Sequence, residues 1–243
     1  MTRRRSLPGT RLPVVAVRST RRRKPSSTRW LSRQLNDPYV VEARRLGYRS
    51  RAAFKLIELD ERFRLLRLGQ RVVDLGCAPG GWTQVAVERV GVRGLVVGID
   101  LAAATPLTGA TLLCGDVRDP STPAVLEAAL GGLADIVLSD MAPTTTGHAA
   151  TDHLRIVALA EDAFAIASQI LKPGGAFVAK VFQGGAEGAL LAALKRDFAE
   201  LRHAKPPASR AESAETYVVA TAFRGGRKVP LSAASFSRER PGV

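Results

Sequence analysis

The sequence has few cysteines, few histidines and no long apolar run, and each shortage excludes a class of protein. The two cysteines among 243 residues, Cys77 and Cys114, are too few for a disulfide framework and lack the paired spacing of a zinc site, which favours a reducing compartment. No apolar segment reaches the ~20 residues that a membrane helix needs, because charged and amide side chains interrupt even residues 156–171. His148 and His153 have no third ligand in sequence reach, so we expect no metal centre.

Acidic residues are absent from the first 30 positions, which hold ten Lys or Arg. Residues 1–71 contain 20 basic and 5 acidic side chains, whereas the remaining 172 residues are nearly balanced, with 16 and 17. The net charge of +14 therefore belongs to the N-terminal third of the chain. Such a charge indicates a polyanionic partner, most commonly nucleic acid, and the alternative is a solvated tail that only aids solubility.

The basic N-terminal third divides into two segments of different character. Residues 1–30 are rich in Arg, Pro, Ser and Thr, and we expect a disordered basic arm; the same composition also fits a mitochondrial transit peptide. In residues 31–68, apolar side chains recur at three- and four-residue steps. This spacing predicts a basic helical lead-in of two helices, with Ser50 as the N-cap of the second.

Beyond residue 69, short β-branched runs alternate with longer helical patterns. The predicted strands are residues 71–75, 94–100, 110–114, 135–139, 175–181, 200–204 and 217–222, and the predicted helices are 81–90, 123–130, 150–171 and 186–198. Alternating strands and helices with apolar strands predict an α/β fold, a seven-stranded and mostly parallel sheet with helices on both faces. Ligands of such sheets bind at the carboxyl ends of the strands.

The segment after the first predicted strand has the features of a ligand-binding loop. Asp74 lies near the strand end, and the glycine-rich residues 76–81 lead into a helix, which lets the backbone approach a ligand closely. Asp100 ends the second predicted strand, where a carboxylate can accept two hydrogen bonds from a ribose diol. The loop does not match the GxGxxG dinucleotide fingerprint, so we expect a nucleoside-bearing cofactor without a pyrophosphate. Asp74 either contacts this cofactor or holds the loop, and Cys77 is expected to be a packing residue.

The sequence resembles the FtsJ/RrmJ (RlmE) family of ribosomal RNA 2'-O-ribose methyltransferases in six segments that occur in family order. They are residues 37–40 (DPYV), 47–56 (GYRSRAAFKL), 74–82 (DLGCAPGGW), 138–143 (LSDMAP), 179–184 (AKVFQG) and 215–219 (ETYVV). The resemblance implies a Rossmann-like methyltransferase domain over residues 31–223, and residues 224–243, which lie outside the resemblance, are expected to form a flexible tail. It also implies methylation of a ribose 2'-hydroxyl, expected to be that of a uridine, in large-subunit (23S) ribosomal RNA, with S-adenosyl-L-methionine as cofactor.

The resemblance further implies a catalytic tetrad of Lys55, Asp140, Lys180 and Glu215. We expect Lys180 to lie nearest the reacting hydroxyl, where the neighbouring ammonium of Lys55 favours release of its proton and Asp140 favours its retention. Two roles for Lys180 therefore stay open, that of general base and that of a group that orients the hydroxyl. Glu215 is expected to anchor the lysines.

For the cofactor, the resemblance implies contacts with Gly80 and Trp82 of the loop, Asp100 at the ribose, Asp116 at the adenine and Asp140 near the methionine end. Carboxylates can accept hydrogen bonds from an adenine amino group or an α-ammonium. A loop acid after a strand is also a common helix N-cap, so this second role stays open for Asp116.

Two alternatives to this function remain at the level of the sequence. One is an RNA-binding ribosome assembly factor without catalysis, although the four charged tetrad residues favour an enzyme. The other is a haemolysin-like or messenger-cap methyltransferase of the same fold that acts on a different RNA. RNA is preferred over DNA because only RNA carries a 2'-hydroxyl. The expected partner is ribosomal RNA within the large ribosomal subunit, in the cytoplasm, with neither a membrane nor a metal involved.

Overall fold

The computed structural model describes residues 35–144, 146–182 and 188–225. The basic arm predicted over residues 1–30 lies outside the described residues, and so does the predicted tail except for its first two residues. In the described part of the chain, none of the helices combines the length and apolar character that a membrane crossing requires.

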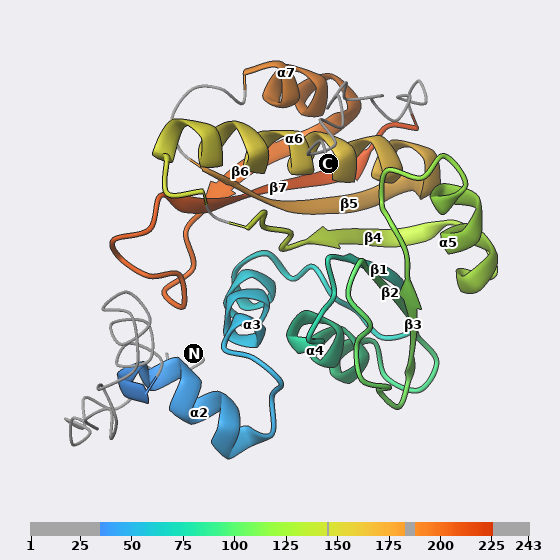
Figure 1. Ribbon diagram of the computed structural model, residues 1–243. Helices are drawn as coiled ribbons and strands as arrows, with labels where there is room; N and C mark the ends of the chain where they lie inside the picture. The colour runs from blue at the N-terminus through green and yellow to red at the C-terminus, as the bar shows by residue number, and fades with distance from the viewer. Residues whose placement is uncertain (1–34, 145, 183–187, 226–243) are drawn as a thin grey trace, which may run out of the picture.

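The described residues form a seven-stranded sheet in the order β3-β2-β1-β4-β5-β7-β6 (Figure 1). The strands are β1 Arg71–Leu75, β2 Leu95–Asp100, β3 Ala110–Cys114, β4 Ala134–Ser139, β5 Leu171–Phe182, β6 Phe198–Ala204 and β7 Glu215–Phe223. Strands β1 to β5 pair in parallel, and β7 is antiparallel to both of its neighbours, β5 and β6. The predicted seven-stranded, mostly parallel sheet is confirmed.

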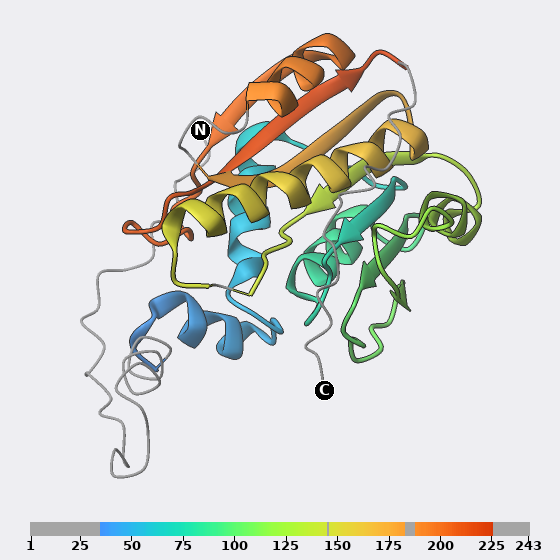
Figure 2. The same ribbon diagram turned by 45° about the horizontal axis from the view of Figure 1, so that its top comes forward.

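Helices cover both faces of this sheet, as predicted. They are α2 Pro38–Leu46, α3 Ala52–Phe63, α4 Gly81–Val90, α5 Thr122–Leu130, α6 Ala149–Ile170 and α7 Gly188–Asp197. One apolar cluster joins the sheet to α5, α6 and α7, and a second joins its other face to α3 and α4. Helix α6 lies lengthwise along β5, and α2 lies outside α3, away from the sheet (Figure 2).

The central strands are apolar at successive positions because both of their faces are buried. In β1, Val72 belongs to the cluster with α3 and α4, and Val73 belongs to the cluster with α5, α6 and α7. In β4, Ile136 and Val137 divide in the same way. The two-residue period of a strand therefore supplies both cores from one continuous apolar run.

Two local predictions were wrong. Strand β5 begins at Leu171 instead of residue 175, because Leu171 already pairs with Ala134 before the register shifts. Ser50 does not cap α3, since Arg51 occupies the N-cap position and no side chain caps this helix. The Ser50 hydroxyl instead packs against Gly81, where a Cβ atom would lie 2.3 Å from it.

Candidate active site

The structure brings the four residues of the predicted tetrad together in one chain of ion pairs. Lys180 Nζ lies 3.0 Å from Asp140 Oδ1, Lys55 Nζ lies 3.5 Å from Asp140 Oδ2, and Lys55 Nζ lies 2.9 Å from Glu215 Oε2. Lys180 Nζ also donates to the backbone oxygen of Asp140 at 2.7 Å. Both lysines are buried, with 6% of Lys180 and 9% of Lys55 exposed. Two cations and two anions thus share a site that is largely closed to water.

Strand pairing places these residues side by side although they are distant in sequence. Ser139 pairs with Ala179 across β4 and β5, so Asp140, the first residue after β4, lies at the level of Lys180 in β5. Glu215 begins β7, the antiparallel neighbour of β5. Lys55 comes from α3, which packs on the α4 side of the sheet. The site therefore forms where the parallel part of the sheet meets its antiparallel strand.

Two side chains that the sequence analysis did not select complete this site. Tyr217 lies opposite Lys180 in the β5–β7 pair, and its hydroxyl donates to Asp140 Oδ1 at 2.7 Å. The Ser209 hydroxyl donates to Glu215 Oε1 at 2.7 Å. Tyr217 was within a quoted family segment, but its strand position is typical of a core residue. Ser209 lies in a loop whose sequence carries no signal.

The electrostatics of the site fix the protonation of Asp140 and Tyr217. Burial alone raises the pKa of Asp140, but the charges of Lys180 and Lys55 and the Tyr217 hydrogen bond outweigh it and hold that pKa below its usual value. Burial, followed by the negative charges of Asp140 and Glu215, raises the pKa of Tyr217 well above its usual value. Asp140 is therefore a carboxylate that accepts from a neutral tyrosine.

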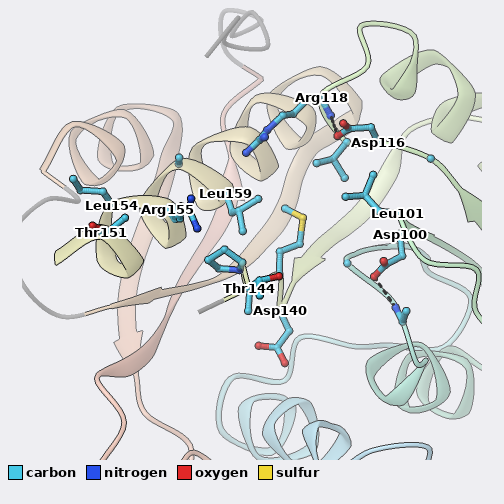
Figure 3. A pocket seen from close by; sticks show the side chains of 18 residues that line it. Asp100, Leu101, Asp116, Arg118, Asp140, Thr144, Thr151, Leu154, Arg155 and Leu159 are labelled. Carbon is cyan, nitrogen blue, oxygen red and sulfur yellow. Dashed lines mark hydrogen bonds between the residues drawn. The ribbon is translucent and has the colours of Figure 1, made fainter. Parts of the chain in front are cut away.

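A cleft of about 800 Å³ adjoins this site at the carboxyl ends of the strands (Figure 3). Asp100, Asp116 and Asp140 contribute carboxylates to its wall, and Leu101 and Met141 contribute apolar surface. The volume lies in the range of about 300 to 1,000 Å³ that small-molecule sites occupy. This position is the one that the sheet topology predicts for a ligand.

Three of the five predicted cofactor residues line the cleft, namely Asp100, Asp116 and Asp140. Asp100 accepts hydrogen bonds from the backbone amides of Ala78 and Ala102, both at 2.9 Å. Asp116 accepts from the backbone amide of Arg118 at 2.9 Å, and Ser121, not Asp116, occupies the N-cap position of α5. The helix-cap alternative for Asp116 is therefore wrong.

The other two predicted cofactor residues, Gly80 and Trp82, are buried beside the cleft and do not line it. The indole nitrogen of Trp82 donates to the Ala52 oxygen at 2.8 Å, and its ring centre lies 5.6 Å from that of Tyr217. Gly80 has φ +111° and lies against Arg49, where a Cβ atom would be 2.7 Å from Nη1. A role of Gly80 and Trp82 toward the cofactor stays a prediction.

A buried carboxyl group, that of Asp74, connects β1 to α4 and so holds the loop between them. Asp74 accepts a 2.6 Å hydrogen bond from the Thr83 hydroxyl of α4, and it does not line the cleft. Of its two open roles, the structure favours holding the loop. Burial raises the pKa of Asp74 to about 7, with smaller contributions from Asp140 and Asp100, while Thr83 opposes the shift. Burial likewise raises the pKa of the Cys77 thiol to about 12, which agrees with a packing residue.

Close contact between two loops shapes the cleft floor. Gly76 has φ +77°, and a Cβ atom there would lie 2.4 Å from Met141 Cγ of the loop after β4. A side chain at this position would separate the two loops that bring Ala78 and Asp140 to the cleft wall. The glycine is therefore required by both its backbone angle and its neighbour.

The chain is similar to known methyltransferases in sequence and in structure. Residues 48–223 match the model of the FtsJ-like methyltransferase family. A protein of Paramagnetospirillum magneticum named ribosomal RNA large subunit methyltransferase E is 63% identical over 222 residues, which cover 89% of this chain and 91% of that protein. A protein of Acidiphilium cryptum with the same name is 61% identical over 214 residues, covering 88% and 94%. A crystal structure from Plasmodium falciparum, described as that of a ribosomal RNA methyltransferase, is 32% identical with a TM-score of 0.67 and covers 74% of this chain and 100% of that chain.

Proposed function

The chain belongs to the FtsJ-like methyltransferase family, and from that premise we propose that it methylates a ribose 2'-hydroxyl, that of a uridine, in large-subunit (23S) ribosomal RNA with S-adenosyl-L-methionine as methyl donor. The observation that carries this proposal is the buried chain of Lys180, Asp140, Lys55 and Glu215 beside an acid-lined cleft. Both relatives are named ribosomal RNA large subunit methyltransferase E, and these names support ribosomal RNA as the substrate.

The donor set of the cleft fits S-adenosylmethionine. When bound, this cofactor supplies an electrophilic methyl group on a positively charged sulfonium. The cleft wall carries carboxylates at Asp100, Asp116 and Asp140, which suit ribose hydroxyls, an adenine amino group and cationic centres. Leu101 and Met141 provide apolar surface for the base. We assign Asp100 to the ribose, Asp116 to the adenine and Asp140 to the methionine end.

The ion-pair chain can position the acceptor hydroxyl and receive its proton. Asp140 holds Lys180 Nζ through both its carboxylate and its backbone oxygen, so the amine has a fixed position at the end of β5. We assign Lys180 to the acceptor hydroxyl, where it acts as general base in the methyl transfer in its neutral amine form, because an ammonium group has no lone pair to receive the proton. Lys55, held by Glu215 and Asp140, contributes positive charge where negative charge develops on the attacking oxygen.

The charge distribution supports RNA as the substrate. The net charge of +14 belongs to the N-terminal third, which includes α3, whose first turn contributes Lys55 to the active site. Basic surface binds phosphates irrespective of base identity and so positions a strand. We propose the large ribosomal subunit as the partner and the cytoplasm as the place of action.

The test of this function is the incubation of the purified protein with labelled S-adenosylmethionine and either large ribosomal subunits or protein-free ribosomal RNA that lack the modification. We expect label in a 2'-O-methyluridine of the large-subunit RNA. Lys180→Ala should abolish the transfer, whereas Lys172→Ala, at the exposed start of the same strand, should retain it. Label in a methylated base would refute the proposed reaction, and cofactor binding without transfer would favour the RNA-binding assembly factor.

Lys180→Arg tests the general-base role, because guanidinium retains the charge and hydrogen bonds but cannot release a proton at neutral pH. We expect its rate to fall on the order of 10² to 10⁴-fold, the usual contribution of general-base catalysis. Near-normal activity with an unchanged pH–rate profile would instead leave Lys180 with an orienting role only.

A further inference from the structure

The cleft continues beyond its acid-lined half toward α6. We define the α6 lobe as the part lined by Thr144, Thr151, Leu154 and Arg155. Figure 3 shows Thr151, Leu154 and Arg155 at one end of the cleft, Asp100 and Asp116 at the other, and Asp140 between them. We propose that the α6 lobe seats the RNA strand and that Arg155 binds a backbone phosphate next to the methylated ribose. This inference rests on the proposed function.

The hydrogen-bond donors of Arg155 are available to a ligand. In the part of the chain that the structure describes, its guanidinium forms neither a hydrogen bond nor an ion pair within the protein, and it attracts the carboxylate of Asp152 electrostatically. Arg118, the other arginine of the cleft wall, differs because its Nε donates to Asp162 Oδ2 at 2.7 Å. Arg118 therefore serves the fold, whereas Arg155 presents a charged group to the cleft.

The charges of the cleft divide it between two kinds of ligand. One half presents the carboxylates of Asp100 and Asp116, which favour a cationic nucleoside and repel phosphate. The α6 lobe presents Arg155, whose planar guanidinium binds phosphate with two parallel hydrogen bonds. A methyl donor in the acidic half and an RNA strand in the α6 lobe would meet at Asp140, beside the ion-pair chain.

The other side chains of the α6 lobe suit a nucleotide strand. Thr144 and Thr151 are exposed hydroxyl groups of the kind that contact phosphate and sugar oxygens. Leu154 is 62% exposed and offers apolar surface to a ribose or base. The lobe thus combines a charge, two polar groups and one apolar contact, three of them in the first two turns of α6 and Thr144 in the loop before it.

Hydrogen bonds fasten the α6 lobe to the active site. Asp152, in the first turn of α6, accepts from the Thr146 amide and hydroxyl at 2.8 and 2.7 Å and from the Gly147 amide at 3.3 Å. These residues end the segment that begins at Asp140, so the helix that carries Arg155 is tied to the loop beside the reacting centre. The contacts thus join the first turn of α6, three residues before Arg155, to the loop that precedes the helix.

The test compares Arg155→Gln with the wild-type full-length protein in steady-state methylation of ribosomal RNA and in equilibrium RNA binding at several salt concentrations. We expect the KM for RNA to rise roughly tenfold, as for one lost hydrogen-bonded charge contact, while kcat and the Kd for S-adenosylmethionine stay unchanged. The slope of log Kd for RNA against log salt should become shallower by about 0.7 to 0.9. Arg155→Lys should recover the slope and only part of the affinity, because lysine lacks the bidentate geometry.

Arg93→Gln is the matched control, since Arg93 is exposed in the turn before β2, at the opposite end of the strands. An unchanged KM and salt slope in Arg155→Gln, equal to those of the control, would overturn the proposal. A weaker Kd for S-adenosylmethionine would also overturn it by assigning Arg155 to the cofactor. If Arg155→Gln does not fold, as judged by thermal unfolding, Arg155→Lys is compared instead, and an unchanged RNA affinity there overturns the bidentate contact. RNA binding is measured without turnover, so absence of methylation by the wild-type protein would refute the proposed function separately.

Discussion

Asp140 is the residue that joins the other polar groups of the candidate site. Its carboxylate faces both lysines of the tetrad and accepts from the Tyr217 hydroxyl, and its backbone oxygen also accepts from Lys180. Removal of one partner from a buried ion pair leaves a charge without compensation, which is costlier than the pair is favourable. The residues around Asp140 therefore act as a unit, and single substitutions among them are expected to be strongly non-additive.

Asp74 makes the stability of the protein depend on pH in a predictable direction. Its pKa is raised from 3.8 to about 7 in the folded protein. Between these values the unfolded chain has released the proton and the folded protein retains it, so the free energy of unfolding falls as pH rises through the folded pKa. Asp74→Asn stays neutral and lacks this loss. We therefore expect the stability of Asp74→Asn relative to the wild type to rise between about pH 5 and pH 7 and to level off above the folded pKa, as measured by urea denaturation.

Asp119→Asn is the matched control for this pH dependence. Hydrogen bonds from Ser121 to the exposed Asp119 lower the pKa of its carboxyl group, which is thus ionised in both states over the same pH range. The difference in stability between Asp119→Asn and the wild type should therefore stay constant over this pH range. Parallel curves for Asp74→Asn and the wild type would show that Asp74 is already ionised in the folded protein.

The sequence located the charged residues of the site better than their neutral partners. Lys55, Asp140, Lys180 and Glu215 stand in segments that resemble a known family, so their positions could be read before the fold was known. Tyr217 contributes a hydroxyl to the site from a strand position that hydrophobic periodicity assigns to the core. Ser209 contacts Glu215 from a loop and has no pattern at all. Such contacts depend on strand register and loop path, which a sequence does not state.

At the scale of elements, short apolar runs that end at a glycine were predictable as strands. Residues 71–75 and 110–114 were predicted to the residue, because Gly76 and Gly115 follow them, although β1 is largely buried and β3 is a partly exposed edge strand. The start of β5 was missed because Pro173 and Gly174 favour a turn, yet they lie within a strand at a register shift. The lead-in helices were predicted, but their contacts with distant parts of the chain were not. Glu58 of α3 accepts from the Ala208 amide at 2.7 Å, across 150 residues of sequence.

The connection between α2 and α3 carries an arginine that holds two loops of the cleft together. Arg49 donates to the Pro79 oxygen at 3.2 Å, to the Thr105 oxygen at 2.6 Å and to the Pro106 oxygen at 2.7 Å. Lysine cannot span these three acceptors from one position. We expect Arg49→Lys to weaken S-adenosylmethionine binding roughly five- to tenfold, on the order of the loss of one ordinary hydrogen bond, with kcat at saturating cofactor nearly unchanged.

Isothermal titration with S-adenosylmethionine measures this effect directly. Arg67→Lys provides the control, because Arg67 is an exposed residue of the loop before β1, at the opposite end of that strand. An unchanged cofactor Kd in Arg49→Lys would mean that the two loops keep their positions without the guanidinium. A decrease in kcat alone would instead assign Arg49 to the transfer step.

At the scale of the whole molecule, most residues of the candidate site and the excess of positive charge belong to different parts of the chain. Residues 72–243 contain 16 basic and 17 acidic side chains, yet they include the cleft and three of the four tetrad residues. The excess positive charge lies before them, in the arm and the lead-in. This division indicates that affinity for RNA and catalysis on RNA can be altered separately.

A protein that lacks residues 1–30 tests this separation, because it loses ten positive charges and none of the tetrad. We expect its RNA affinity to fall and its salt slope to become shallower by about 0.7 to 0.9 for each phosphate contact that the arm makes, while kcat at saturating RNA is retained. A full-length variant with the ten basic residues replaced by Gln separates the effect of charge from that of length. If both proteins keep the wild-type slope, the phosphates are bound outside the arm, by the lead-in helices and the α6 lobe. If kcat falls with RNA saturating, the arm contributes to placing the ribose as well as to holding the strand.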